Sequence, residues 1–167
     1  VMFRNEAGLE RTLSRADLHA EVAALAAAFR ADGIGPGDRI AAYVPNVPET
    51  IIAMLAAASL GAVWSSCSPD FGVRGVLDRF GQIAPTVLIV TDGYSYGGKR
   101  IPTLPRIAEM LPDLPSVRQV VVVPFLDPAP SLGNIPDGLL WDDFLGPATT
   151  APPELTKLAP CASYSRR

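Results

Sequence analysis

Two short runs of β-branched residues set the strongest limit on how this chain can fold. Thr86–Thr91 reads Thr-Val-Leu-Ile-Val-Thr, and Gln119–Val123 carries four successive valines. Runs that are apolar at every position, rather than at every second one, are typical of strands covered on both faces, as in a parallel sheet. The chain must therefore supply helices for both faces of such a sheet.

The rest of the first 123 residues alternates between helical and strand patterns. Apolar spacing and turn residues predict helices over residues 15–32, 48–60, 73–83 and 103–111, and further strands over 39–44 and 62–66. Ser14 followed by Asp17 predicts an N-cap for the first helix. Short strands that alternate with helices predict an α/β fold with a mostly parallel sheet of βα repeats.

The chain changes character after the second valine-rich run. We predict a βα-repeat subdomain over residues 1–123 and an irregular Pro- and Gly-rich extension over residues 124–167, in which only residues 139–145 carry an ordered pattern.

Composition excludes several classes of protein. The chain has 14 Lys and Arg against 17 Asp and Glu, a net charge of −3, which argues against a nucleic-acid-binding domain. Cys67 and Cys161 lie far apart, so neither a zinc site nor a disulfide framework is indicated. The longest uncharged stretch, Thr50–Pro69, is broken by glycine and serine and falls short of a membrane span. With no signal-peptide pattern at its start, the chain is expected in the cytoplasm.

Two tempting motifs have plainer explanations. His19 is the single histidine and lies beside the apolar stripe of the first helix. No Ser or Cys near it lies in the strand-turn-helix elbow of a catalytic nucleophile, so we interpret it as a solvated or half-packed side chain. Gly33–Gly37 resembles a dinucleotide fingerprint, but that motif must follow a strand and open a helix. Here it follows a helix, which indicates a C-terminal helix turn.

Gly93–Arg100 leaves three interpretations open. The segment follows a strand and matches the first seven positions of a phosphate-binding P-loop, but Arg100 stands where a Mg²⁺-binding Ser or Thr belongs. It could instead be a flexible glycine turn with solvated charges. The third possibility is an anion site of another kind, in which Gly98 brings backbone N–H groups close and Lys99 and Arg100 supply two cations.

Trp64–Pro69 ends a predicted buried strand and enters a loop. Ligands of open α/β sheets bind beyond the carboxyl ends of the strands, where Ser65 and Ser66 would offer hydrogen bonds to a narrow ligand. A tight strand-to-turn crossing explains the same small residues equally well. Cys67 has no histidine or other base in view and is no candidate nucleophile.

Several segments together resemble the adenylate-forming acyl-CoA synthetases of the AMP-binding superfamily. They are Pro36–Ala41, Pro45–Glu49 and Ala56–Ser66. Within that superfamily Val63–Gly72 and Gly75–Phe80 are similar to the acetoacetyl-CoA synthetases, and residues 92–94, 98–100 and 141–145 extend the similarity. The resemblance covers roughly residues 3–160 and implies that the βα repeats form part of the N-terminal domain of such an enzyme.

The resemblance implies a two-step ligation of acetoacetate, or another short acyl carboxylate, to coenzyme A. The carboxylate attacks ATP in a Mg²⁺-dependent step that gives an acyl-adenylate, and the CoA thiol then displaces AMP. It also implies that Gly98, Lys99 and Arg100 hold the CoA nucleotide phosphates and that the segment Trp64, Ser65, Ser66 and Cys67 lines the CoA channel. It places no catalytic residue and no metal ligand in this chain.

The phosphate-binding loop of such enzymes would begin just after Pro160, where this chain reads Cys161–Arg167. We therefore expect a fragment that does not adenylate a substrate alone and that self-associates through exposed apolar surface. Two alternatives stay open: a P-loop-like nucleotide-binding protein, and a non-catalytic fragment that binds CoA or acts as a decoy for an intact synthetase.

Overall fold

A five-stranded parallel sheet forms the centre of the molecule. The computed structural model describes residues 1–6 and 8–146. The sheet strands are β3 (Arg39–Tyr43), β4 (Val63–Cys67), β5 (Val87–Thr91), β8 (Gln119–Val123) and β9 (Gly138–Leu140). They lie in the order β4-β3-β5-β8-β9, and every neighbouring pair is parallel. The predicted α/β class is confirmed.

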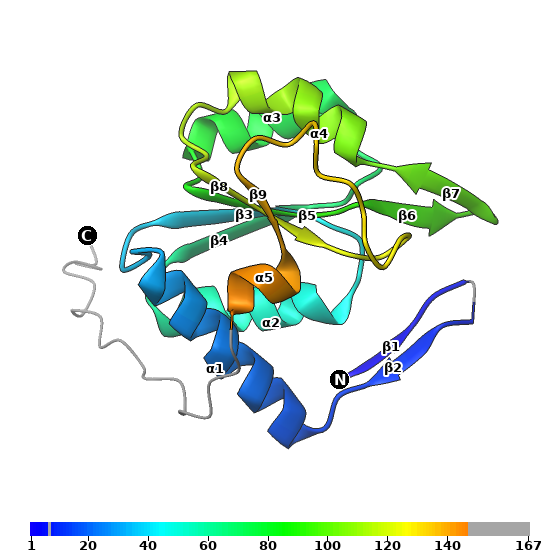
Figure 1. The fold of residues 1–167 in the computed structure, drawn as a ribbon. Helices are drawn as coiled ribbons and strands as arrows, with labels where there is room; N and C mark the ends of the chain where they lie inside the picture. Colours follow the sequence, from blue (N-terminus) through cyan, green and yellow to red (C-terminus); the bar gives the residue numbers. More distant parts are fainter. Residues whose placement is uncertain (7, 147–167) are drawn as a thin grey trace, which may run out of the picture.

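Helices cover both faces of this sheet (Figure 1). One face carries α1 (Arg15–Ala31), α2 (Pro48–Ser59) and α5 (Trp141–Leu145), and the other carries α3 (Val73–Ile83) and α4 (Leu104–Met110), which the 3-10 turn η1 (Leu111–Asp113) follows. Each face has its own apolar core. Phe29 anchors the first and Phe80 the second, both without exposed surface. β5 is buried along its whole length, as its β-branched composition predicts.

The first helix begins and ends where its sequence indicates. The Ser14 side chain accepts a hydrogen bond from the Asp17 N–H at 3.1 Å, and the Asp17 carboxylate accepts one from the Ser14 N–H at 2.9 Å, which completes a capping box. Gly33 follows the helix with φ +77°, a conformation that glycine adopts without strain. The glycine-rich segment is therefore a helix-terminating turn, as predicted, and His19 lies exposed on α1.

Two antiparallel hairpins, which the sequence analysis did not predict, lie outside the sheet (Figure 1). β1 (Met2–Arg4) pairs with β2 (Glu10–Thr12), and β6 (Gly93–Tyr96) pairs with β7 (Lys99–Pro102). Gly97 and Gly98, with φ of +57° and +73°, make the two-residue turn between β6 and β7. Residues 93–100 therefore do not follow the strand–loop–helix path of a P-loop, and that interpretation is wrong.

β4 is less buried than the sequence predicts. In the described part of the chain it lies at the edge of the sheet, paired with β3 alone, and Val63 is 50% exposed. Its sequence is apolar enough for a buried strand, but strand order, which the local pattern does not encode, leaves one edge open.

Residues beyond the second valine-rich run also contribute to the sheet. β9 pairs in parallel with β8, and α5 packs on α1, where the Phe29 and Phe144 rings lie 5.7 Å apart between centroids. These are the residues 139–145 that carry an ordered pattern. The division at residue 123 remains a prediction. Within residues 1–6 and 8–146, no helix has both the length and the apolar character needed to cross a membrane.

The β6–β7 hairpin begins with a glycine, Gly93, because neighbouring atoms leave no room for a side chain there. A Cβ on Gly93 would lie 2.6 Å from the Ile101 carbonyl oxygen and would overlap Leu126 Cδ1. Gly81 within α3 has nothing within 4 Å of the corresponding point.

We predict opposite effects of the same substitution at these two glycines. Gly93→Ala lowers the free energy of unfolding by about 1–3 kcal/mol because the backbone must move to relieve the overlap. Gly81→Ala raises it by about 0.5–1 kcal/mol because alanine favours the helix. Urea denaturation followed by circular dichroism measures both. A Gly93→Ala variant as stable as the parent chain would contradict the close packing.

Candidate functional site

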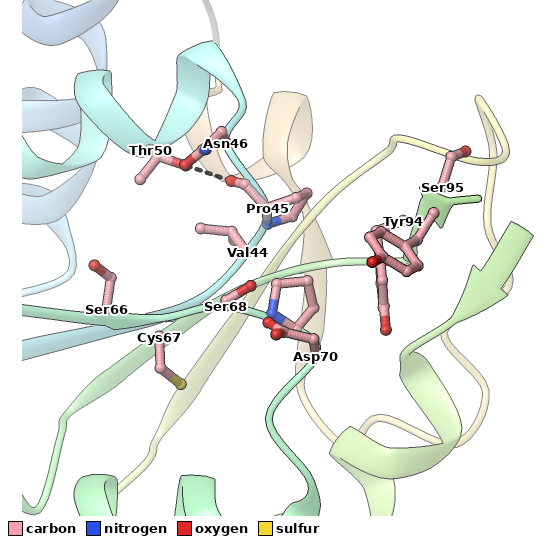
Figure 2. Close-up of a pocket in the computed structure, with 12 residues that line it drawn as sticks. Val44, Pro45, Asn46, Thr50, Ser66, Cys67, Ser68, Asp70, Tyr94 and Ser95 are labelled. Atoms are coloured by element: carbon pink, nitrogen blue, oxygen red, sulfur yellow. Dashed lines mark hydrogen bonds between the residues drawn. The ribbon is translucent and has the colours of Figure 1, made fainter. Parts of the chain in front are cut away.

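A pocket of about 560 Å³ opens at the carboxyl ends of β3 and β4, beside the β6–β7 hairpin. Its walls are residues 44–46 after β3, residues 66–70 at the end of β4, residues 94–96 of β6 and the side chain of Thr50. Figure 2 shows these three segments converging on the pocket, with the Thr50 hydroxyl donating a hydrogen bond to the Pro45 carbonyl at 3.1 Å.

The topology explains why a pocket forms here. The connection that leaves β3 runs through α2 on one face of the sheet, and the connection that leaves the adjacent β5 reaches α4 on the opposite face. Neighbouring strands whose connections diverge in this way leave a crevice between their carboxyl ends. This crevice is the usual ligand position in open α/β sheets.

Only half of the predicted channel segment on β4 lines this pocket. Ser66 and Cys67 line it, whereas Trp64 packs against the core of the α1–α2 face and half-buried Ser65 lies outside the lining. Successive side chains of a strand point to opposite faces, so Ser66 and Cys67 diverge in Figure 2. The two residues nearest the carboxyl end reach the pocket because the strand stops there.

The loop that closes the pocket below β4 is held by a buried tyrosine. The hydroxyl of Tyr43, which has no exposed surface, lies 2.7 Å from the Pro69 carbonyl oxygen and 2.8 Å from that of Phe71. Burial raises the pKa of Tyr43, partly opposed by the Arg106 guanidinium, so the phenol stays protonated as a donor at neutral pH. The Arg106 guanidinium also donates to the Pro69 carbonyl at 3.4 Å.

Gly98 and Arg100 belong to a second groove, between the β1–β2 and β6–β7 hairpins. It has a volume of about 430 Å³, and Asn5, Glu6, Ser95 and Leu126 are also among its lining residues. Arg100 donates a hydrogen bond to the Leu126 carbonyl, and Lys99 is exposed on the same hairpin without lining the groove. Ser95 lines both this groove and the pocket at the strand ends, so the two are adjacent.

The Gly97–Gly98 turn binds a carboxylate. The Gly97 N–H donates to one carboxylate oxygen of Glu6 at 3.1 Å, and the Gly98 N–H donates to the other at 3.2 Å. The predicted property of this turn, that its backbone N–H groups can face an anion, is thus met by a residue of the same chain.

A buried aspartate positions the backbone beneath Arg100. Asp92 is 6% exposed, and its carboxylate accepts hydrogen bonds from the N–H groups of Phe125, Leu126 and Asp127 at 2.7, 2.9 and 2.8 Å. A carboxylate that accepts several backbone N–H bonds is well compensated for burial. Asp92 therefore orients the loop whose Leu126 carbonyl receives the Arg100 guanidinium.

Local sequence patterns did not identify four kinds of site residue: Glu6, Tyr43, Asp92 and the tyrosines of β6. A signal for the hairpin was present, since Tyr94-Ser95-Tyr96 and Lys99-Arg100-Ile101 flank a Gly-Gly dipeptide, a typical hairpin pattern. Nothing local marks Glu6 or Asp92, because their partners lie 91 and 33 or more residues away in the sequence. The residues that follow Pro160 lie outside the described residues.

The implied cofactors fit this chain unequally. The Gly97 and Gly98 N–H groups hold the carboxylate oxygens of Glu6, and Lys99 and Arg100 follow directly, so this donor set has the chemistry that a phosphate requires. Within the described residues, no group of three or more His, Cys, Asp or Glu side chains could hold a metal ion. We assign no residue to Mg²⁺ or to ATP.

Cys67 should react slowly despite lining a pocket. Burial raises the pKa of its thiol to about 11, so at pH 8 the thiolate is on the order of 100-fold scarcer than for an ordinary thiol. In a Cys161→Ser variant we expect alkylation by iodoacetamide to be correspondingly slow and to keep rising with pH to about 11. The urea-unfolded variant is the control. A rate that levels off near pH 9 in the folded chain would contradict this prediction.

Known proteins resemble this chain over most of its length. Acetoacetyl-coenzyme A synthetase of Rhizobium meliloti (strain 1021) is 47% identical over 146 residues, which are 87% of this chain and 22% of that protein. Acetoacetyl-CoA synthetase of Xenopus tropicalis is 46% identical over 132 residues, 78% of this chain and 20% of that protein. The chain thus spans about a fifth of the length of these relatives.

The fold agrees with that of a solved acetoacetyl-CoA synthetase. The solved structure of acetoacetyl-CoA synthetase from Streptomyces lividans superposes with a TM-score of 0.85 and 39% identity, over 94% of this chain and 23% of that one. The family described as AMP-binding enzyme matches residues 2–158. The resemblance stated from the sequence motifs is confirmed, and the chain belongs to the AMP-binding enzyme family.

Proposed function

We propose that this chain is the part of an acetoacetate–CoA ligase that binds the nucleotide end of CoA. The complete ligase would form acetoacetyl-CoA from acetoacetate, ATP and CoA through an acyl-adenylate. The similarity to acetoacetyl-CoA synthetases supports the reaction class. The role of this chain is inferred from one observation: the Gly97–Gly98 turn binds a carboxylate, so its amides are arranged to receive an oxyanion.

Three residues of the β6–β7 hairpin have distinct parts in this proposal. The Gly98 N–H donates to a phosphate oxygen. Lys99, a flexible point charge, neutralises the phosphate, and Arg100, oriented by the Leu126 carbonyl, adds directed N–H donors. CoA supplies the thiol that displaces AMP, in a step to which we assign no residue of this chain.

The pocket at the strand ends would take the pantetheine arm. Its position beside the hairpin, with Ser95 common to both, lets one extended ligand run from the hairpin into the pocket. The Ser66 hydroxyl would form hydrogen bonds with the pantetheine amides, and the protonated Cys67 thiol would form part of the pocket wall. Trp64 and Ser65 act in this proposal by holding β4 in place, since neither lines the pocket.

A chimera tests whether this chain can serve as the corresponding segment of an acetoacetate–CoA ligase. Residues 2–146 replace the corresponding segment of the Rhizobium meliloti enzyme, and we expect acetoacetate-dependent ATP–pyrophosphate exchange and acetoacetyl-CoA formation. Lys99→Ala/Arg100→Ala in the chimera should raise KM for CoA while leaving the exchange reaction unchanged, since the exchange does not involve CoA. A chimera that carries out no exchange would reject the assignment of this chain to an acetoacetate–CoA ligase.

Titration calorimetry tests the CoA site in the 167-residue chain itself. We expect Lys99→Ala and Arg100→Ala each to weaken CoA binding by about 10- to 100-fold, because each removes a charge-assisted contact of about 1.5–3 kcal/mol. CoA lacking its 3′-phosphate should bind weakly to the parent chain and lose little further in these variants. Arg74→Ala, an exposed arginine on α3 that lines neither the pocket nor the groove, is the matched control. Equal binding by all four proteins would reject the role of the hairpin.

A further inference from the structure

Glu6 reaches across the chain to occupy both amides of the Gly97–Gly98 turn. Its two carboxylate oxygens accept one hydrogen bond each, at 3.1 and 3.2 Å. The residues are 91 and 92 positions apart in the sequence. Glu6 belongs to the β1–β2 hairpin, whose strands pair with each other and with no other described strand.

The turn has the properties of an anion site in its own right. Two successive glycines with positive φ point their N–H groups toward the same carboxylate, a concave arrangement that favours negative charge. Lys99 follows directly, and Arg100 lines the same groove as Glu6. Such a site is satisfied by any oxyanion of suitable size, and a phosphate presents more acceptor oxygens and more charge than a carboxylate.

Glu6 can leave this position at small cost. Its side chain is exposed, and among the described residues its carboxylate contacts only these two N–H groups. Water can therefore solvate the carboxylate when it turns away. Gly98 and Arg100 would then face an open groove of about 430 Å³.

We propose that Glu6 is a tethered competitor that a phosphate-bearing ligand must displace from the Gly97–Gly98 turn. The inference rests on the proposed function, in which the same turn receives a CoA phosphate. A tethered carboxylate competes at a high effective concentration, so it lowers the apparent affinity of the turn for free anions. The β1–β2 hairpin thereby regulates access to the site without taking part in the reaction.

The competing explanation is a purely structural clamp between the two hairpins. The two explanations predict opposite signs for the effect of removing Glu6 on anion binding. A competitor suppresses binding, so its removal strengthens it. A clamp preserves the shape of the turn, so its removal weakens binding or leaves it unchanged.

Nuclear magnetic resonance can follow the turn directly. We would titrate inorganic phosphate, at constant ionic strength, into the 167-residue chain and its Glu6→Ala and Glu6→Gln variants, and record the amide signals of Gly97 and Gly98. We expect Glu6→Ala to bind phosphate about tenfold more tightly than the parent chain, with saturable shifts of both signals. Glu6→Gln should fall between them, because an amide oxygen still accepts a hydrogen bond but carries no charge.

Glu10→Ala is the matched control. Glu10 is an exposed carboxylate on the same hairpin that pairs with Arg4 at 3.1 Å, so its removal changes the net charge equally without opening the turn. Phosphate affinity in Glu6→Ala that equals or falls below that of the parent chain overturns the proposal. A gain of the same size in Glu10→Ala also overturns it, since the effect would then come from net charge.

The same variants separate this inference from the proposed function. One outcome is that Glu6→Ala gains phosphate affinity, but the parent chain binds CoA and CoA lacking its 3′-phosphate with equal affinity. Glu6 is then a competitor, and the CoA assignment is wrong. If CoA binding depends on the 3′-phosphate and on Lys99, but Glu6→Ala gains nothing, the CoA assignment holds and the competitor is rejected.

Discussion

The pairing of β3 with a parallel neighbour on each side is the constraint on which the remaining structure depends. β3 meets β4 along one edge and β5 along the other, and the register of both pairs aligns their carboxyl ends. Because the chain leaves β3 toward one face and β5 toward the other, the helices cannot close over the strand ends between them. The pocket of about 560 Å³ is the space that this arrangement leaves.

The groups of the β6–β7 hairpin that we propose bind a ligand lie outside the sheet, but the sheet determines their positions. Asp92 follows β5 directly and binds the three N–H groups that come just after β8, two strands that are adjacent and parallel. The sheet thus brings together the start of the β6–β7 hairpin and the loop that receives Arg100. The buried Asp92 carboxylate thus links the start of the hairpin that carries the Gly97–Gly98 turn to the sheet.

Local patterns were sufficient to identify the repeating elements. The helix over Val73–Ile83 and the strand over Gln119–Val123 have the bounds that their apolar spacing and β-branched residues predict. The N-cap at Ser14 could also be predicted, because Ser14 and Asp17 lie within one turn of helix, and the structure adds that the two form a reciprocal capping box. The family resemblance rested on contiguous motifs such as Val63–Gly72, and so it too could be recognised without a structure.

The sequence by itself determined the alternation of strands and helices, the family and the presence of cations beside a Gly-Gly dipeptide. The tertiary structure alone decided that β4 forms an edge among the described strands, that Ser66 and Cys67 rather than Trp64 and Ser65 face the pocket, and that Glu6 fills the turn. The reason is one of range. Helix periodicity and turn chemistry act between residues a few positions apart, whereas strand order and the meeting of Glu6 with Gly97 depend on how distant segments pack.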